Sequence, residues 1–355
     1  MTYARRFFLL VFLFALSANF SRAQQPSPNP PPPGSVPAQS QSQVPAQAPG
    51  QPAQEQVPTI RSTVSLVHLV ATAMDRRHNF ITDLEKSDFK VLEDGVPQEI
   101  KLFGRETDLP LRIGLLLDTS NSIRPRLQFE QDAAIDFLTS VIRRNKDMAF
   151  LMTFDNEPEV VQDYTGDLAL LTGAIRKQRA GGGTALHDAI FKAAEKLTNP
   201  PQPKTPSQEV RRVMVVISDG DDNLSDHALS EAVEVAIRAE ASIYSISTNT
   251  DWLATSGDVP RKMHLAPGDK ILQKFAEESG GRVFYPYKVE DLAQSFVDIG
   301  TELRSQYFIA YSPSNPQPNG RYRRIEVDTL RKGLTIRTRK GYYATAAALA
   351  PSPAQ

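Results

Sequence analysis

The chain has 355 residues, 40% of them hydrophobic, and a formal net charge of −1. This length allows one large domain with a smaller one, or two domains of medium size. The net charge gives no indication of a nucleic acid or an anionic membrane surface as a partner. Cysteine is absent from the sequence, which excludes disulfides, thiolate metal sites and thiol nucleophiles.

The N-terminus has the pattern of a secretory signal. Arg5-Arg6 supplies the positive start, residues 7–16 form the apolar core, and a small-x-small cleavage pattern ends at Ala23. We predict a signal peptide at residues 1–23, and therefore export to the periplasm, the cell envelope or the medium. An uncleaved anchor is the alternative, but the apolar run is too short to span a bilayer comfortably. We predict no membrane span once the signal is removed.

The next segments are a linker and a β-rich region. Residues 24–58 are rich in Pro, Gln, Ser and Ala, so we predict a disordered linker that cannot bury a core. Residues 59–107 have strand patterns, and Asp94-Gly95, a dipeptide favoured in tight hairpin turns, lies between the patterns at 89–92 and 99–102. Because hairpins of this size are marginal alone, this segment must pack on another part of the chain.

From residue 108 to 304, strand patterns alternate with amphipathic helix patterns. The apolar runs at 111–117, 148–154 and 213–218 have no polar alternation, which is typical of strands buried on both faces. Helical spacing over residues 128–144 predicts one of the covering helices. We predict an α/β fold with a doubly wound, mostly parallel sheet.

Residues 305–345 return to strand patterns, and we predict a disordered tail at 346–355. Since β segments flank the α/β region, we expect 305–345 to pair with 59–107 in a small antiparallel β-sandwich-like domain. The α/β domain would then be inserted in that domain or flanked by it. The last strands are basic, which indicates charge-protected edges or, as the alternative, a basic binding face.

Oxygen-bearing side chains follow the first apolar strand. Asp118, Ser120 and Ser122 lie on the loop that leaves the strand at 111–117. In open α/β sheets, ligands bind beyond the carboxyl ends of strands, and hard cations such as Mg²⁺ choose oxygen ligands. The sequence therefore predicts a divalent-cation site at this end of the sheet.

Two further features fit such a site. Thr184 follows the glycine-rich loop at 181–183 and opens a predicted helix, and Asp219 ends the apolar strand at 213–218. With the first loop, these residues resemble the metal-ion-dependent adhesion site of the von Willebrand factor type A, or integrin I-like, domain. This resemblance covers about residues 111–303. Segments 89–95, 278–282 and 341–343 resemble the secreted subfamily of these domains that is abundant in acidobacteria.

The resemblance implies a set of ligands and a mode of binding. The ligands of Mg²⁺, or of Mn²⁺ or Ca²⁺ in its place, would be Asp118, Ser120, Ser122, Thr184 and Asp219. Two carboxylates and three hydroxyls leave an octahedral ion one open position, which an Asp or Glu of a protein partner can fill. The alternative for Asp118 and Asp219 is a role as helix caps and turn formers. We expect the acidic residues that follow Asp219 to cap the helix from Ala228, and the alternative is that they make the rim of the site more negative. They are Asp221, Asp222 and Asp226.

Catalytic motifs are missing from the sequence. Ser120 replaces the second carboxylate of an aspartyl phosphotransferase, the glycine-rich loop lacks a P-loop lysine, and no Gly-x-Ser-x-Gly elbow occurs. We predict that the protein is not an enzyme but an exported, metal-dependent, adhesion-type protein-binding module. One alternative is a cell-envelope structural or assembly protein whose cation only stabilises the loops. A hydrolase is the third class.

Overall fold

A computed structural model of the protein describes residues 65–105, 109–202, 210–249, 265–286, 289–346 and 348–349. The chain divides into two compact units, Met1–Ile60 and Arg61–Gln355, and the second contains all the described residues. The predicted signal peptide, the linker and most of the predicted tail lie outside the described residues. In the described part of the chain, no helix has the length and apolar character needed to cross a membrane.

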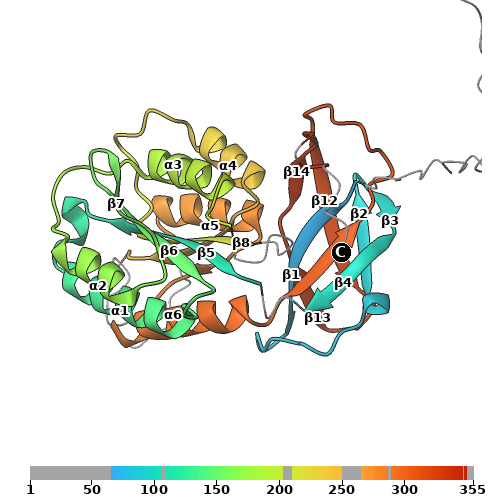
Figure 1. The fold of residues 1–355 in the computed structure, drawn as a ribbon, viewed down its shortest axis with the longest axis horizontal. Helices are drawn as coiled ribbons and strands as arrows, with labels where there is room; N and C mark the ends of the chain where they lie inside the picture. The colour runs from blue at the N-terminus through green and yellow to red at the C-terminus, as the bar shows by residue number, and fades with distance from the viewer. Residues whose placement is uncertain are drawn as a thin grey trace, which may run out of the picture. The chain divides into compact units, whose positions relative to one another are not determined.

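The α/β part alternates strands with helices along the chain (Figure 1). Its strands are β5 (Leu111–Asp118), β6 (Met148–Phe154), β7 (Pro158–Thr165), β8 (Arg211–Ser218), β9 (Ser242–Ser247) and β10 (Val283–Phe284). Its helices are α1 (Leu127–Val141), α2 (Leu168–Lys177), α3 (Leu186–Thr198), α4 (Leu229–Arg238), α5 (Pro267–Ser279) and α6 (Val289–Leu303). The strand order is β10-β9-β8-β5-β6-β7, and only the edge strand β7 is antiparallel to its neighbour. This arrangement confirms the predicted doubly wound, mostly parallel sheet.

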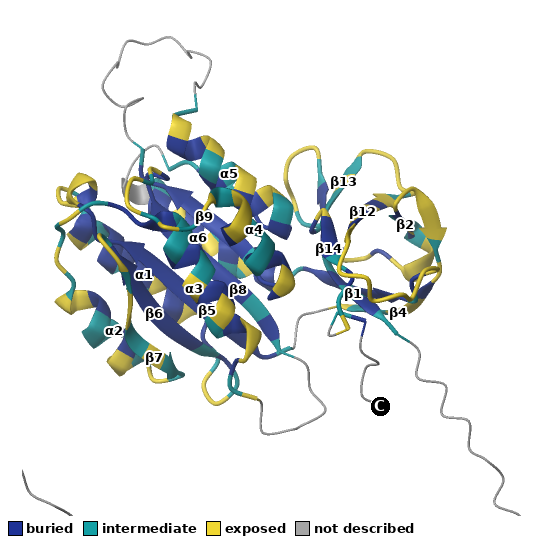
Figure 2. Ribbon diagram, turned by 90° about the horizontal axis from the view of Figure 1, so that it is seen from above, coloured by how far each residue is buried: buried dark blue, intermediate teal, exposed yellow. Residues whose placement is uncertain are grey.

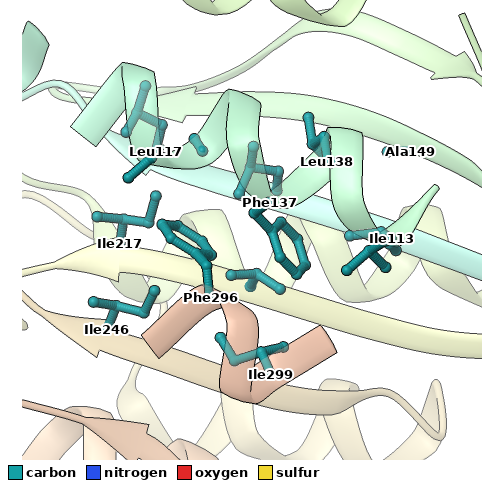
Figure 3. Close-up of a cluster of buried hydrophobic side chains, with 14 of the residues drawn as sticks. Ile113, Leu117, Phe137, Leu138, Ala149, Ile217, Ile246, Phe296 and Ile299 are labelled. Carbon is teal, nitrogen blue, oxygen red and sulfur yellow. The ribbon is translucent and has the colours of Figure 1, made fainter. Parts of the chain in front are cut away.

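The strands of this sheet are largely buried (Figure 2), and one hydrophobic cluster lies on each of its faces. On one face, α1, α2 and α6 pack on the strands, and the rings of Phe137 and Phe296 lie 5.0 Å apart between α1 and α6 (Figure 3). On the other face, α3, α4 and α5 contribute a second cluster that includes Ile190 and Phe275. Because β5 is central in the sheet, all of its residues are buried, including its final residue, Asp118.

The other strands form two antiparallel sheets with one shared core. They are β1 (Val67–Asp75), β2 (Phe89–Glu93), β3 (Val96–Gln98), β4 (Ile100–Arg105), β11 (Tyr307–Tyr311), β12 (Tyr322–Thr329), β13 (Leu334–Arg337) and β14 (Gly341–Tyr343). The sheet orders are β13-β1-β11-β4 and β14-β12-β2-β3. Strands from before and after the α/β part are thus direct neighbours, as in β1 with β11 and β2 with β12. The predicted boundaries of the domains stay a prediction.

The Asp94-Gly95 turn forms, but it joins different strands from those predicted. Asp94 and Gly95 have φ values of 49° and 80°, as a two-residue type I′ turn requires. The turn pairs β2 with β3, whereas most of the predicted partner at 99–102 lies in β4, which pairs with β11 of the other sheet. Ile100 is buried in the core shared by the two sheets, so this long-range packing replaces the local pairing.

The basic residues of the C-terminal strands include several in ion pairs. Arg323 pairs with Glu93 at 3.1 Å, and each of these side chains is only 4% exposed. Arg339 pairs with Glu240, also at 3.1 Å. These pairs favour structural roles for the charges over the alternative of a basic binding face.

Replacement of Glu93 tests the buried ion pair. Glu93→Ala is expected to lower the free energy of unfolding by about 3–5 kcal/mol, because it leaves the Arg323 charge buried without its partner. Glu93 also accepts hydrogen bonds from the hydroxyls of Tyr311 and Tyr342, at 2.6 and 3.0 Å. Guanidinium unfolding measures the change.

A matched control is Glu99→Ala, because Glu99 pairs with Lys101 through side chains that are 74% and 41% exposed. This variant is expected to keep the wild-type unfolding midpoint. Equal losses of stability in the two variants would contradict the structural role assigned to Glu93.

Candidate metal site

The loop after β5 begins with a buried carboxylate. Asp118 has no exposed surface. Its Oδ1 accepts a hydrogen bond from the Ser120 N–H at 2.8 Å, and its Oδ2 accepts one from the Ser218 hydroxyl at 2.6 Å. Burial raises the pKa of Asp118 to about 6 against these hydrogen bonds, and the nearby charge of Asp219 adds to the rise. A bound cation would stabilise the ionised form of this side chain.

Two hydroxyls follow Asp118 on the same loop. The Oγ atoms of Ser120 and Ser122 lie 3.0 Å apart. Ser120 is buried and Ser122 is exposed, so the pair extends from the interior to the surface. Such a pair offers two hard oxygen ligands side by side.

Backbone hydrogen bonds join this loop to the glycine-rich loop. The Gly181 N–H donates to the Thr119 carbonyl at 2.8 Å, and the Asn121 N–H donates to the Gly182 carbonyl at 3.3 Å. Gly182 has a φ of 78°, a left-handed conformation that glycine adopts at little cost. The glycine therefore permits the two loops to meet.

Thr184 is linked in turn to the loop after β8. Its N–H donates to Oδ1 of Asn223 at 3.0 Å, and its carbonyl accepts from the N–H groups of Asn223 and Leu224 at 3.0 and 3.1 Å. Thr184 is 4% exposed and Asp219, which begins the third loop, is 8% exposed. Thr184 does not open the helix as predicted, because α3 begins two residues later at Leu186.

The acidic residues after Asp219 do not cap α4, which corrects the expectation from the sequence. At the start of α4, Glu231 accepts the Ala228 N–H at 2.7 Å. Asp222 instead accepts the His187 N–H at 2.9 Å, at the first turn of α3. The loop folds back toward α3, so the Asp222 carboxylate stabilises the helix that follows Thr184.

A third buried carboxylate, which the sequence analysis missed, lies close to these loops. Glu130 of α1 is 1% exposed, and neither of its carboxylate oxygens has a hydrogen-bond partner among the described residues. Burial, with smaller effects from the charges of Asp118 and Asp219, raises the pKa of Glu130 to about 8 against the opposing effect of Arg126. Its position, four residues before Ala134 and seven before Phe137, puts it on the apolar stripe of the helix. That spacing is the sequence signal that could have revealed it.

The donor set fits a hard divalent cation. Carboxylate and hydroxyl oxygens are suitable ligands, and a positive charge nearby would stabilise the ionised forms of the buried Asp118 and Glu130 side chains. Within the described ranges, no three His, Cys, Asp or Glu side chains converge as the ligands of one metal ion.

Comparison with known families agrees with this fold. Residues 113–221 match the family described as von Willebrand factor type A domain. The matched residues extend from β5 to the loop after β8, so this part of the chain is similar to that domain. The more specific acidobacterial subfamily stays a prediction. No curated protein sequence matches the chain.

Several solved structures are similar to this one. BatB from Bacteroides thetaiotaomicron is 17% identical over 54% of this chain and 99% of its own, with a TM-score of 0.41. A von Willebrand factor type A protein from Catenulispora acidiphila is 13% identical over 81% and 76%, with a TM-score of 0.42. Proximal thread matrix protein 1 from the mussel byssus, with a zinc-occupied MIDAS motif, is 18% identical over 60% and 50%, with a TM-score of 0.44. These similarities concern the fold alone.

The burial of Asp118 leads to a prediction for the metal-free protein. Asp118→Asn is expected to raise the midpoint of thermal unfolding in EDTA by a few degrees. The amide keeps the shape of the side chain and removes a buried charge from beside Asp219. Differential scanning calorimetry measures the midpoint.

The control is Asp136→Asn, an exposed position of α1, which is expected to leave the midpoint unchanged. A lower midpoint for Asp118→Asn would contradict the prediction. It would mean that the hydrogen bonds from Ser120 and Ser218 to the charged carboxylate outweigh the cost of its burial.

Proposed function

We propose that this protein is an exported, metal-dependent, adhesion-type protein-binding module. A Mg²⁺ ion, or Mn²⁺ or Ca²⁺, would be held by Asp118, Ser120, Ser122, Thr184 and Asp219. The bound ion would coordinate an Asp or Glu side chain of a protein partner. The observation that carries the proposal is the set of hydrogen bonds that joins the three loops beside the buried Asp118 carboxylate.

The roles of the residues follow from their surroundings. When bound, the ion supplies positive charge and an open position for the partner's carboxylate. The Ser218 hydroxyl and the Ser120 N–H each hold one oxygen of Asp118, which fixes that carboxylate before the ion arrives. Ser122, at the exposed end of the hydroxyl pair, is the ligand nearest to solvent and to an incoming partner.

The rim of the site offers an apolar contact as well. Leu224 is 46% exposed, and a Cβ built on Gly183 would come within 2.5 Å of its Cδ1. Leu224 therefore lies against the glycine-rich loop at the surface. An exposed leucine beside the ion would add hydrophobic contact and help to select the partner.

We propose binding rather than catalysis because the sequence lacks the second carboxylate, the phosphate-loop lysine and the nucleophile elbow that catalytic alternatives need. The second candidate function is structural, in the cell envelope, with a cation that only stabilises the loops. The burial of Asp118 and Thr184 favours it, because a buried ion would mainly compensate charge. Under that alternative, chelation lowers thermal stability but leaves partner binding intact.

Calorimetric titration of the purified chain with Mg²⁺ and Mn²⁺ tests the cation site. The wild type is expected to bind one ion, and Asp118→Ala is expected to bind none, because it removes a ligand and the acceptor for Ser120 and Ser218. Asp221→Ala, which changes an exposed carboxylate two residues after Asp219, is the control and should bind normally. Equal binding by Asp118→Ala and the wild type would rule out the assigned ligands.

Selection from a displayed random-peptide library tests the mode of partner binding. Peptides captured in Mg²⁺ and released by EDTA are expected to share an Asp or Glu. Changing that residue to Asn or Gln is expected to weaken binding at least tenfold, because the charge-assisted bond to the ion is lost. Asp118→Ala should capture none of them. Retention of the selected peptides by Asp118→Ala would contradict coordination through the ion.

A further inference from the structure

Glu130 is a buried carboxylate that the five proposed ligands leave unexplained. It is 1% exposed, and both of its side-chain oxygens lack a hydrogen-bond partner in the described part of the chain. A carboxylate without partners in the protein interior is costly. On the core-facing stripe of α1, a Leu or Met would fill the same space without that cost. Its presence calls for a ligand that compensates it.

The start of α1 is tied to the same end of the sheet as the proposed site. The Glu130 N–H donates to the Arg126 carbonyl at 3.0 Å, one turn earlier in the helix. The guanidinium of Arg126 donates to the Thr248 carbonyl, and the Thr248 N–H donates to the Ser218 carbonyl at 3.0 Å, directly before Asp219. Glu130 thus lies one turn of α1 behind the carboxyl ends of β8 and β9.

Two observations limit what Glu130 can do there. Arg126 is the nearby cation, but its guanidinium donates a hydrogen bond to the Thr248 carbonyl and not to Glu130. Among the described residues, Glu130 does not join Asp118 and Asp219 in a cluster that could hold one metal ion directly. A water molecule between Glu130 and the ion would give the Glu130 oxygens a hydrogen-bond partner without direct coordination of the ion.

We propose that Glu130 is a third carboxylate of the cation site, which acts through water by accepting a hydrogen bond from a water molecule bound to the ion. This inference rests on the proposed cation site. Some groups do not touch the metal but form hydrogen bonds to its ligands. Replacing such a group typically lowers the metal affinity 10–100-fold. Glu130 would thereby increase the affinity of the site for the ion.

Manganese titration of a graded series tests the proposal, with Mn²⁺ alone as the probe. Glu130→Gln keeps an acceptor oxygen but loses the charge, and Glu130→Met loses both. The Kd for Mn²⁺ is expected to rise about tenfold or more in Glu130→Gln and further in Glu130→Met. Asp136→Asn, the same loss of charge at an exposed position of α1, should stay within about twofold of the wild type.

Thermal unfolding in EDTA separates this role from a structural one. Both Glu130 variants are expected to melt at or above the wild-type temperature, since they remove a buried carboxyl group whose oxygens lack hydrogen-bond partners, while their Mn²⁺ affinity falls. The inference is wrong if both variants bind Mn²⁺ with an affinity within about twofold of the wild type. It is also wrong if their lower affinity is accompanied by a lower melting temperature in EDTA.

The same series distinguishes failure of this inference from failure of the proposed function. If the wild type binds Mn²⁺ and Asp118→Ala does not, while Glu130→Gln and Glu130→Met bind normally, only the role of Glu130 is wrong. If the wild type binds no Mn²⁺, the cation site and the role of Glu130 are both wrong.

Discussion

The burial of one carboxylate at the end of the central strand governs this structure. Helices cover both faces of the sheet, so every residue of β5 is buried, and Asp118 ends the strand inside the protein. An ionised carboxylate in such a place is unfavourable unless hydrogen bonds or a positive charge compensate it. Ser120 and Ser218 supply the hydrogen bonds. A divalent cation would supply the positive charge. The buried carboxylate would then lower the stability of the metal-free protein and be needed for binding the ion.

The parallel register of the sheet brings the proposed ligands to one edge. Leu117 of β5 pairs with Ile217 of β8, so the chain leaves both strands at the same level, toward Asp118 and Asp219. The glycine-rich loop then closes the arrangement through hydrogen bonds to the first loop. Apolar burial therefore positions the strands, and the loops need only short-range hydrogen bonds to assemble.

The sequence predicted best what depends on local pattern. Unbroken apolar runs identified β5, β6 and β8, and the Asp94-Gly95 turn formed as expected. The prediction from the sequence was wrong where long-range packing determines the pairing, since β4 pairs with β11 and not with β2. Glu130 was missed because only apolar residues were counted on the helix stripe. The approach of α1 to the ends of β8 and β9 is a tertiary contact that no spacing along the chain reports.

A crystal structure of the protein grown or soaked with Mn²⁺, with anomalous scattering at the manganese edge, tests the central claim most directly. The account predicts one Mn²⁺ peak at the ends of β5 and β8, held by oxygens of Asp118, Ser120, Ser122, Thr184 and Asp219. It also predicts a metal-bound water within hydrogen-bonding distance of Glu130. No peak at this edge of the sheet, or an ion bound elsewhere with these loops empty, would contradict it.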